Sequence, residues 1–178
     1  MAKLYTSLNP SLQTFIKAQK IFFVATAPKE GRINISPKGM DSLRVLDYNR
    51  LVWLNVTGSG NETAAHLLEN PRIIIMLCAF EGAPNILRIY GKGSAIYPDS
   101  ATWNSLEKLF PKIPGARQIF DIKIESILTS CGMAIPFYEY LGEREQLNDW
   151  ATEKGEAGIK AYWKDKNTKS LDGKPTGL

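Results

Sequence analysis

Apolar and polar residues alternate in short runs along most of the chain, which predicts β-strands separated by turns. The runs are rich in Ile, Val, Phe and Trp, and clusters of Gly, Pro, Asn and Asp bound them. We expect strands over residues 21–27, 32–36, 43–46, 51–56, 72–80, 85–97 and 121–129.

Apolar residues at helical spacing predict helices between some of these strands. Asn9 is suited to cap a first helix over residues 11–19, because Pro10 then takes the first helical position. Further helices are expected over residues 62–69, just after Pro98, and over residues 143–154.

This order of elements favours a small antiparallel β-barrel with helices packed outside it. Strands and helices do not alternate strictly, so a doubly wound parallel sheet is disfavoured. The fold class is therefore predicted to be mainly β with flanking helices. We expect a single domain over residues 1–163 and a polar, flexible tail over residues 164–178.

Composition narrows the function classes. Of the 178 residues, 44% are hydrophobic and 22% are charged, and no run approaches the length that a membrane span needs. No signal-peptide core begins the chain, so a cytoplasmic protein is expected. His66 is the single histidine, which argues against a histidine-built metal site or a Ser-His-Asp triad. Cys78 and Cys131 are expected to be reduced thiols.

The polar loop Thr57–Thr63 lies between a predicted strand and a predicted helix. Its glycines let backbone N–H groups approach a ligand, its hydroxyls can donate to phosphate oxygens, and a helix N-terminus follows. These features predict an anion site. The alternative is a capped loop without a ligand, in which Ser59 and Glu62 form a capping box or Asn61 is the N-cap.

Two other segments carry candidate chemistry. The strand that ends in Ser36–Gly39 places backbone amides and Lys38 at a barrel rim, although an ordinary strand exit explains the same pattern. Arg88 and Lys92 are four residues apart and therefore share one face of a strand, where they could meet a phosphate or simply face solvent.

The order of these segments resembles the pyridoxamine 5'-phosphate oxidase-like family of FMN-binding split β-barrels. The resemblance rests on Asn34–Gly39, then Thr57–Asn61, then a helix ending in Glu69–Arg72 before a hydrophobic strand. Glu81–Pro84 and Gly91–Gly93 extend it, so that it covers roughly residues 10–155.

The resemblance implies a Greek-key split barrel that forms a homodimer, with FMN bound at the subunit interface. On this interpretation the isoalloxazine ring lies beside Ser36, Pro37 and Lys38, and Arg88 comes from a neighbouring strand, in the same or the other subunit. The ribityl chain and phosphate are held by the loop residues Thr57, Ser59, Gly60, Asn61 and Thr63.

Two departures concern the reaction. Pyridoxamine phosphate oxidases usually place Ser-x-Lys in the phosphate loop, whereas Ser59 is followed here by Gly60-Asn61, and the chain end at Lys174–Leu178 does not match their substrate-binding segment. We therefore expect an FMN-dependent oxidoreductase that is not a true pyridoxamine phosphate oxidase. The alternatives are a non-catalytic flavin-binding module, or a split barrel that uses F420 or haem. A nucleic-acid-binding barrel is disfavoured, because the basic residues are scattered although the net charge is +4.

Overall fold

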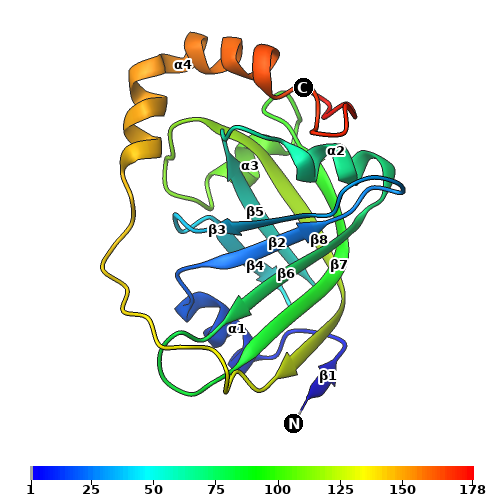
Figure 1. Cartoon of the computed structure of the whole chain (residues 1–178), viewed down its shortest axis with the longest axis vertical. Helices are drawn as coiled ribbons and strands as arrows, with labels where there is room; N and C mark the ends of the chain where they lie inside the picture. The colour runs from blue at the N-terminus through cyan, green and yellow to red at the C-terminus, as the bar shows by residue number, and fades with distance from the viewer. Residues whose placement is uncertain (1) are drawn as a thin grey trace.

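All strand pairings in the computed structural model, which describes residues 2–178, are antiparallel, and the sheet curls into a barrel with helices outside it (Figure 1). The strands are β1 Lys3–Tyr5, β2 Phe22–Thr26, β3 Asn34–Lys38, β4 Leu43–Asp47, β5 Arg50–Val56, β6 Arg72–Cys78, β7 Ile86–Ile96 and β8 Ala116–Ser130. The helices are α1 Pro10–Ala18, α2 Glu62–Glu69, α3 Trp103–Glu107 and α4 Gln146–Lys166.

The strand order explains why the barrel is split. The sheet runs β3-β2-β6-β7-β8-β5-β4, and β1 pairs with β8 outside this path. Strands β3 and β4 therefore form the two edges, and the sheet does not close between them. The mainly β fold with flanking helices that the sequence predicts is confirmed.

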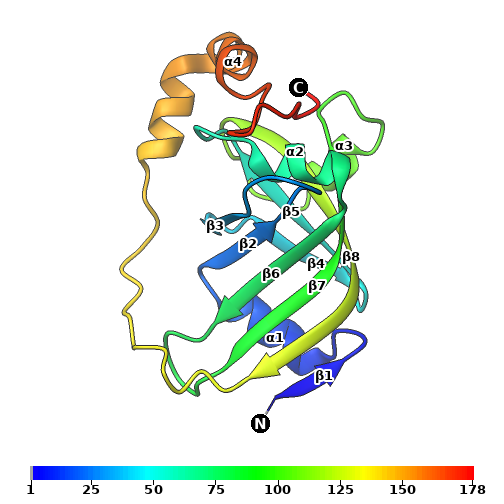
Figure 2. The ribbon, with the colours of Figure 1, turned by 45° about the vertical axis from the view of Figure 1, so that its right-hand side comes forward.

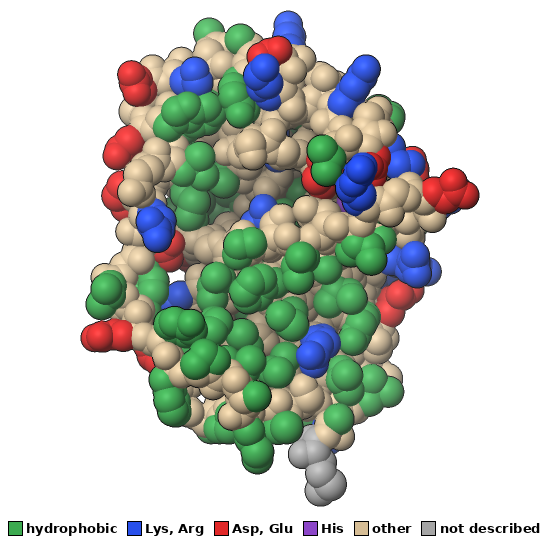
Figure 3. Space-filling view, in the orientation of Figure 1, with side chains coloured by type: hydrophobic (Ala, Val, Ile, Leu, Met, Phe, Trp, Pro, Cys, Tyr) green, Lys and Arg blue, Asp and Glu red, His purple; other side chains and the backbone are tan. Residues whose placement is uncertain are grey.

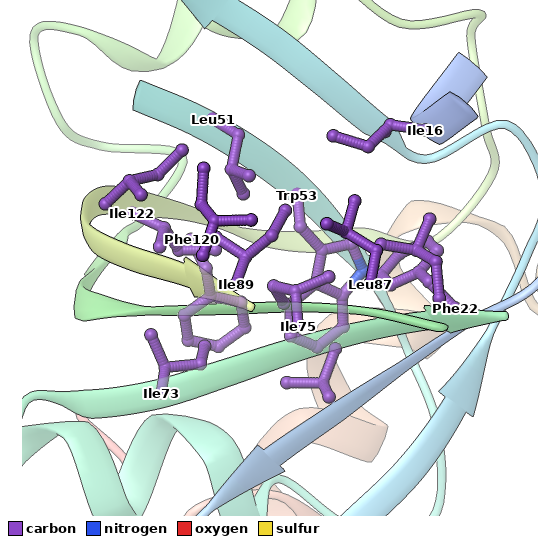
Figure 4. Close-up of a cluster of buried hydrophobic side chains, with 14 of the residues drawn as sticks. Ile16, Phe22, Leu51, Trp53, Ile73, Ile75, Leu87, Ile89, Phe120 and Ile122 are labelled. Carbon is purple, nitrogen blue, oxygen red and sulfur yellow. The ribbon is translucent and has the colours of Figure 1, made fainter. Parts of the chain in front are cut away.

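The core fills the barrel because alternate residues of each strand point inward. Leu87 and Ile89 on β7 are fully buried, and the Trp53 and Phe120 rings stack with their centroids 4.8 Å apart. Figure 4 shows these rings among aliphatic side chains from β6 and β7 and beside Phe22 of β2. This packing holds β5 and β8 rigidly beneath the split.

The strand exit predicted at Ser36–Gly39 lies at the end of β3, which extends to Lys38 rather than to residue 36. β3 continues through Pro37 and Lys38, pairing with Phe23 and Phe22 of β2. Proline is tolerated there because β3 is an edge strand, so the missing N–H leaves no ladder partner unsatisfied. Met40, just beyond the strand, has a φ of 62°, which turns the chain away towards β4.

The two predicted N-terminal caps differ in outcome. Asn9 caps α1 as expected, since its side chain accepts a hydrogen bond from the Leu12 N–H at 2.9 Å. Asn61 occupies the N-cap position of α2 but makes no side-chain capping bond. The Ser59–Glu62 capping box is also not formed, because a Glu62 carboxylate oxygen accepts from the Leu171 N–H instead.

The C-terminal residues are not the flexible tail that the sequence suggested. Helix α4 runs on to Lys166, with a kink at Gly155, and Asn167 and Thr176 beyond it are fully buried. A connecting segment over residues 131–145 first contacts the barrel, where the Tyr138 N–H donates to the Phe80 carbonyl at 3.1 Å, and then runs beside it to α4, which returns to the barrel end that carries α2 (Figures 1 and 2). Among residues 2–178, no helix has the length and apolar character to cross a membrane.

Candidate functional site

The open side of the split brings Lys38 and Ser36 to the inner face of the barrel. Both are paired with the inward-facing residues Phe22 and Val24 of β2, and directly opposed residues share a face. The Lys38 ammonium group lies 5.2 Å from the centroid of the Trp53 ring, which is on β5. Lys38 thus points across the split rather than out to solvent, while Pro37 and Ile35 face the other way.

Arg117 is the second cation near the split, and a β-bulge turns its side chain into the barrel. The pairing of β5 with β8 shifts between Asn55 and Val56, which face Gln118 and Ala116, so Arg117 is the extra residue. Its side chain is 2% exposed. We did not predict this residue, because the expected strand began at residue 121. A run of four buried residues from Arg117 to Phe120 breaks the alternation of the strand.

Lys38 and Arg117 carry positive charge that no carboxylate balances. Within residues 2–178, neither forms an ion pair. Burial, together with the nearby charge of Arg117, lowers the pKa of Lys38 to about 8. Burial also lowers the pKa of Arg117 to about 10. Two cations withdrawn from water in this way favour an anion between or beside them.

A buried polar network surrounds Arg117. The Gln118 side-chain oxygen accepts from Arg117 Nε at 2.9 Å and from Asn55 Nδ2 at 3.0 Å. The Gln118 amide donates to the Asn61 side-chain oxygen at 3.1 Å. The Arg117 guanidinium also donates to the Asn167 side-chain oxygen at 2.5 Å. All of these side chains are less than 10% exposed, so the network fixes their positions.

The predicted phosphate loop lies against this network. Arg117 donates to the Gly60 carbonyl at 3.0 Å, and Ser59 and Gly60 are exposed at the loop tip. Thr57 is buried, and its hydroxyl donates to the Gly115 carbonyl while it accepts from Trp163 Nε1 at 2.7 Å. Asn61 is committed to the network, whereas Thr63 is buried in the first turn of α2.

Arg88 lies apart from the other predicted site residues. It is on the outer face of the sheet, opposite Met76 and Leu128, and it donates to the Ser130 hydroxyl at 3.0 Å. Lys92 shares this outer face, as predicted, and forms an ion pair with Glu125. One protomer therefore brings Ser36, Lys38 and the loop together and leaves Arg88 on the opposite surface.

A cavity of about 1150 Å³ adjoins Lys38. The connecting segment and the start of α4 form one wall, and the end of β3 forms the other. Its lining includes Lys20, Pro37, Lys38, Met40, Tyr138, Tyr140, Glu143 and Leu147. Figure 3 shows the surface hollowed between α4 and the barrel, with basic side chains at the floor of the hollow. The cavity is large enough for a drug-sized ligand and mixes apolar with charged walls.

The geometry can be compared with known proteins. Residues 8–131 match the family described as pyridoxamine 5'-phosphate oxidase. The chain belongs to this family. The pyridoxamine 5'-phosphate oxidase family protein ustO of Aspergillus flavus is 32% identical over 191 residues, covering 96% of this chain and 76% of that protein.

Solved structures show the same fold at lower identity. HupZ from Group A Streptococcus superimposes with a TM-score of 0.55 at 20% identity, covering 67% of this chain and 91% of that one. An FMN-binding protein from Syntrophomonas wolfei gives a TM-score of 0.50 at 19% identity, covering 66% of this chain and 82% of that one. The split-barrel fold that the resemblance implied is therefore shown.

Proposed function

We propose that this member of the pyridoxamine 5'-phosphate oxidase family binds FMN in the split and acts as a flavin-dependent oxidoreductase. The observation that supports the proposal best is the pair of cations, Lys38 and Arg117, which no carboxylate neutralises among the described residues. The phosphate of FMN would provide the missing negative charge.

The residues divide between the two ends of the cofactor. Arg117 and the loop around Ser59 and Gly60 are suited to the phosphate, because they combine a guanidinium with backbone amides and a hydroxyl. Ser36 and Lys38 are suited to border the ring from the inner face of the split, and Pro37 and Lys38 line the cavity beside it. When bound, FMN supplies hydride or electron transfer at its ring. Lys38 would place a positive charge beside the ring, and Trp53 would exclude water beneath that charge.

We also propose that the functional unit is a homodimer. The outer face of β2, β6 and β7 presents apolar side chains in register, and Figure 3 shows them as a continuous patch over these strands. The members of this face are Phe23, Ala25, Ile74, Met76 and Tyr90, and Ile35 of β3 and Leu128 of β8 flank them. Arg88 lies within it, so a second subunit is the route by which Arg88 could approach a cofactor.

The first test is a visible absorption spectrum of the purified protein with and without added FMN. We expect flavin bands that elute with a dimer. Flavin reduction by NADH or NADPH would separate an oxidoreductase from a non-catalytic flavin-binding module. A protein that ignores FMN but binds F420, or that shows a haem Soret band, would overturn the cofactor assignment.

The second test uses the loop itself. We expect the double substitution Ser59→Ala and Thr63→Ala to weaken FMN binding at least tenfold and riboflavin binding much less, because only FMN carries the phosphate. Equal losses for the two ligands would remove the loop from the phosphate site and would leave the ring assignment at Pro37–Lys38 standing.

A further inference from the structure

The C-terminal residues beyond the family match pack directly on the candidate phosphate loop. The match ends at residue 131, whereas Trp163 Nε1 donates to the Thr57 hydroxyl at 2.7 Å and the Leu171 N–H donates to Glu62 at 2.9 Å. The segment is fastened further by the ion pairs Arg32–Asp172 and Glu69–Lys174. Residues beyond the family match therefore form a wall on the outer side of the loop.

Asn167 is the centre of this wall. It is fully buried, and its side-chain nitrogen donates to the Gly58 carbonyl at 3.1 Å and lies 3.5 Å from the Ser59 carbonyl. Its side-chain oxygen accepts from Arg117 at 2.5 Å. The orientation of the amide follows from chemistry, because a guanidinium only donates and a carbonyl only accepts. Asn167 thus joins the guanidinium to the loop by both ends of one small side chain.

The same contacts orient the loop peptides. The carbonyl groups of Gly58, Ser59 and Gly60 face Asn167 or Arg117. In a planar trans peptide the N–H points opposite to the carbonyl, so the N–H groups of Ser59 and Gly60 point away from Asn167, and that of Asn61 points away from Arg117. None of these three N–H groups has a backbone or side-chain acceptor in the part of the chain that the structure describes.

Arg117 is held but not neutralised. Its guanidinium uses three hydrogen bonds, to Gln118, to Asn167 and to the Gly60 carbonyl, out of five N–H donors. All three acceptors are uncharged, so the full positive charge and two donors remain for a ligand. A carboxylate at position 167 would hold the guanidinium equally well but would cancel the charge.

We infer that Asn167 is a positioning residue for the anionic end of the cofactor. It orients the Arg117 guanidinium and the Gly58 and Ser59 carbonyl groups so that cationic and amide donors remain free for a phosphate. The inference rests on the proposed binding of FMN. It extends the site to a C-terminal segment that lies outside the family match.

The test compares FMN and riboflavin affinities, measured by flavin fluorescence quenching, in Asn167→Asp and Asn167→Ser. The aspartate keeps an acceptor for Arg117 but adds a negative charge and loses the donor to Gly58. We expect it to weaken FMN binding at least tenfold and riboflavin binding less than twofold. The serine is neutral and too short to join both partners, and we expect a smaller loss, of about threefold to tenfold, again confined to FMN.

Asn104→Asp on the exposed face of α3 is the matched control, because it makes the same chemical change away from the site. Circular dichroism and a thermal melt show whether each variant is folded, and the serine variant decides the matter if the aspartate variant is not. Parallel losses of FMN and riboflavin, or no loss, would reduce Asn167 to a structural residue. Wild-type protein that binds neither flavin would instead overturn the proposed function.

Discussion

The Lys38 ammonium group on the edge strand β3 lies 5.2 Å from the centroid of the Trp53 ring on β5, across the open side of the barrel. A cation over an indole ring gains about 0.5–2 kcal/mol, which offsets part of the cost of leaving water. The remaining cost is visible in the pKa of Lys38, which burial and the Arg117 charge lower to about 8. The protein keeps this destabilised cation beside a cavity, which is typical of a binding group rather than of a structural one.

We predict that FMN binds less tightly as pH rises above about 8. A flavin ring bound beside Lys38 would favour the protonated form of this residue and raise its pKa, so binding takes up a proton once free Lys38 has lost it. The phosphate itself is already ionised in this range. We expect the Kd for FMN to rise about tenfold between pH 7.5 and 9.5. Fluorescence titration in Lys38→Met should show weaker binding without this pH dependence, and a parallel pH slope in the variant would contradict the assignment.

The stability of the free protein should depend on pH in the opposite way to FMN affinity: it should rise, rather than fall, as pH increases above about 8. Because the folded-state pKa of Lys38 lies below the unfolded value of 10.5, the unfolded chain binds more protons between about pH 8 and 10.5. The destabilisation is therefore complete below pH 8 and is relieved as pH rises through this window. We expect Lys38→Met to be more stable than wild type at pH 7 by about 1–3 kcal/mol, and this advantage to shrink towards pH 10. Urea unfolding at both pH values measures it.

Substitution by alanine should leave stability nearly unchanged at Gly60 but reduce it at Gly91. A Cβ on Gly60 would meet only the Glu62 side chain, whose Oε1 atom is nearest at 3.7 Å, so Gly60→Ala should change stability by no more than about 0.5 kcal/mol. It should nevertheless weaken FMN binding, because the methyl group stands where a phosphate would approach the loop. Thermal melts and FMN titration of one sample separate the two effects.

Gly91→Ala is the counterpart in the sheet. Its Cβ would lie 2.4 Å from the Lys123 carbonyl oxygen, at the bulge between β7 and β8. Backbone must shift to admit it, so we expect a loss of about 1–3 kcal/mol. A Gly91→Ala protein as stable as wild type would mean that the bulge is looser than the structure shows.

Alternation of apolar residues was sufficient to predict most strands and the fold class, because the barrel has one buried and one exposed face. The same reasoning failed at Arg117, where a bulge turns a charged residue into the core without any local signal in turn residues. It also failed for residues 164–178, whose polar composition is that of a loose tail. Asn167 and Thr176 are buried there through long-range hydrogen bonds to Arg117 and within the segment, which periodicity does not report.

Only part of the candidate site could be predicted from the sequence, because only local patterns can be recognised without the fold. Ser36, Lys38 and the 57–63 loop were identified from local sequence, since glycines, hydroxyls and a strand exit form a local pattern. The contact of the loop with Asn167 joins chain segments about a hundred residues apart. Local sequence could not indicate which cations would lie together, and Arg88, which was expected to approach the cofactor from the same or the other subunit, lies on the outer face of the sheet.

Met40 offers a test of strain in the turn that follows Lys38. Its φ of 62° is left-handed, a conformation that costs a residue with a side chain about 1–2 kcal/mol. After the entropy of glycine is subtracted, we expect Met40→Gly to stabilise the protein by about 0.5–1 kcal/mol. Met133→Gly, at an exposed position whose φ is not positive, is the matched control and should not stabilise it. Urea midpoints at constant m-value measure both, and a destabilised Met40→Gly would mean that the side chain contributes more by packing than the turn costs.

The outer face of β2, β6 and β7 gives the last prediction. Ile74 lies at its centre, directly opposite Ala25 and Tyr90 on the neighbouring strands. Large apolar patches of this kind are uncommon on soluble monomers, so the face is expected to be covered by a second copy of the chain. Ile74→Glu would bury a carboxylate in that interface, and we expect it to convert a dimer to a monomer in light scattering coupled to gel filtration. Leu68→Glu, at an exposed apolar position on α2, should remain dimeric.

If Arg88 of a second subunit serves the cofactor, the Ile74→Glu monomer should also bind FMN more weakly. A monomer with wild-type affinity would show that one chain holds the cofactor alone, with Lys38 and Arg117 as its cations.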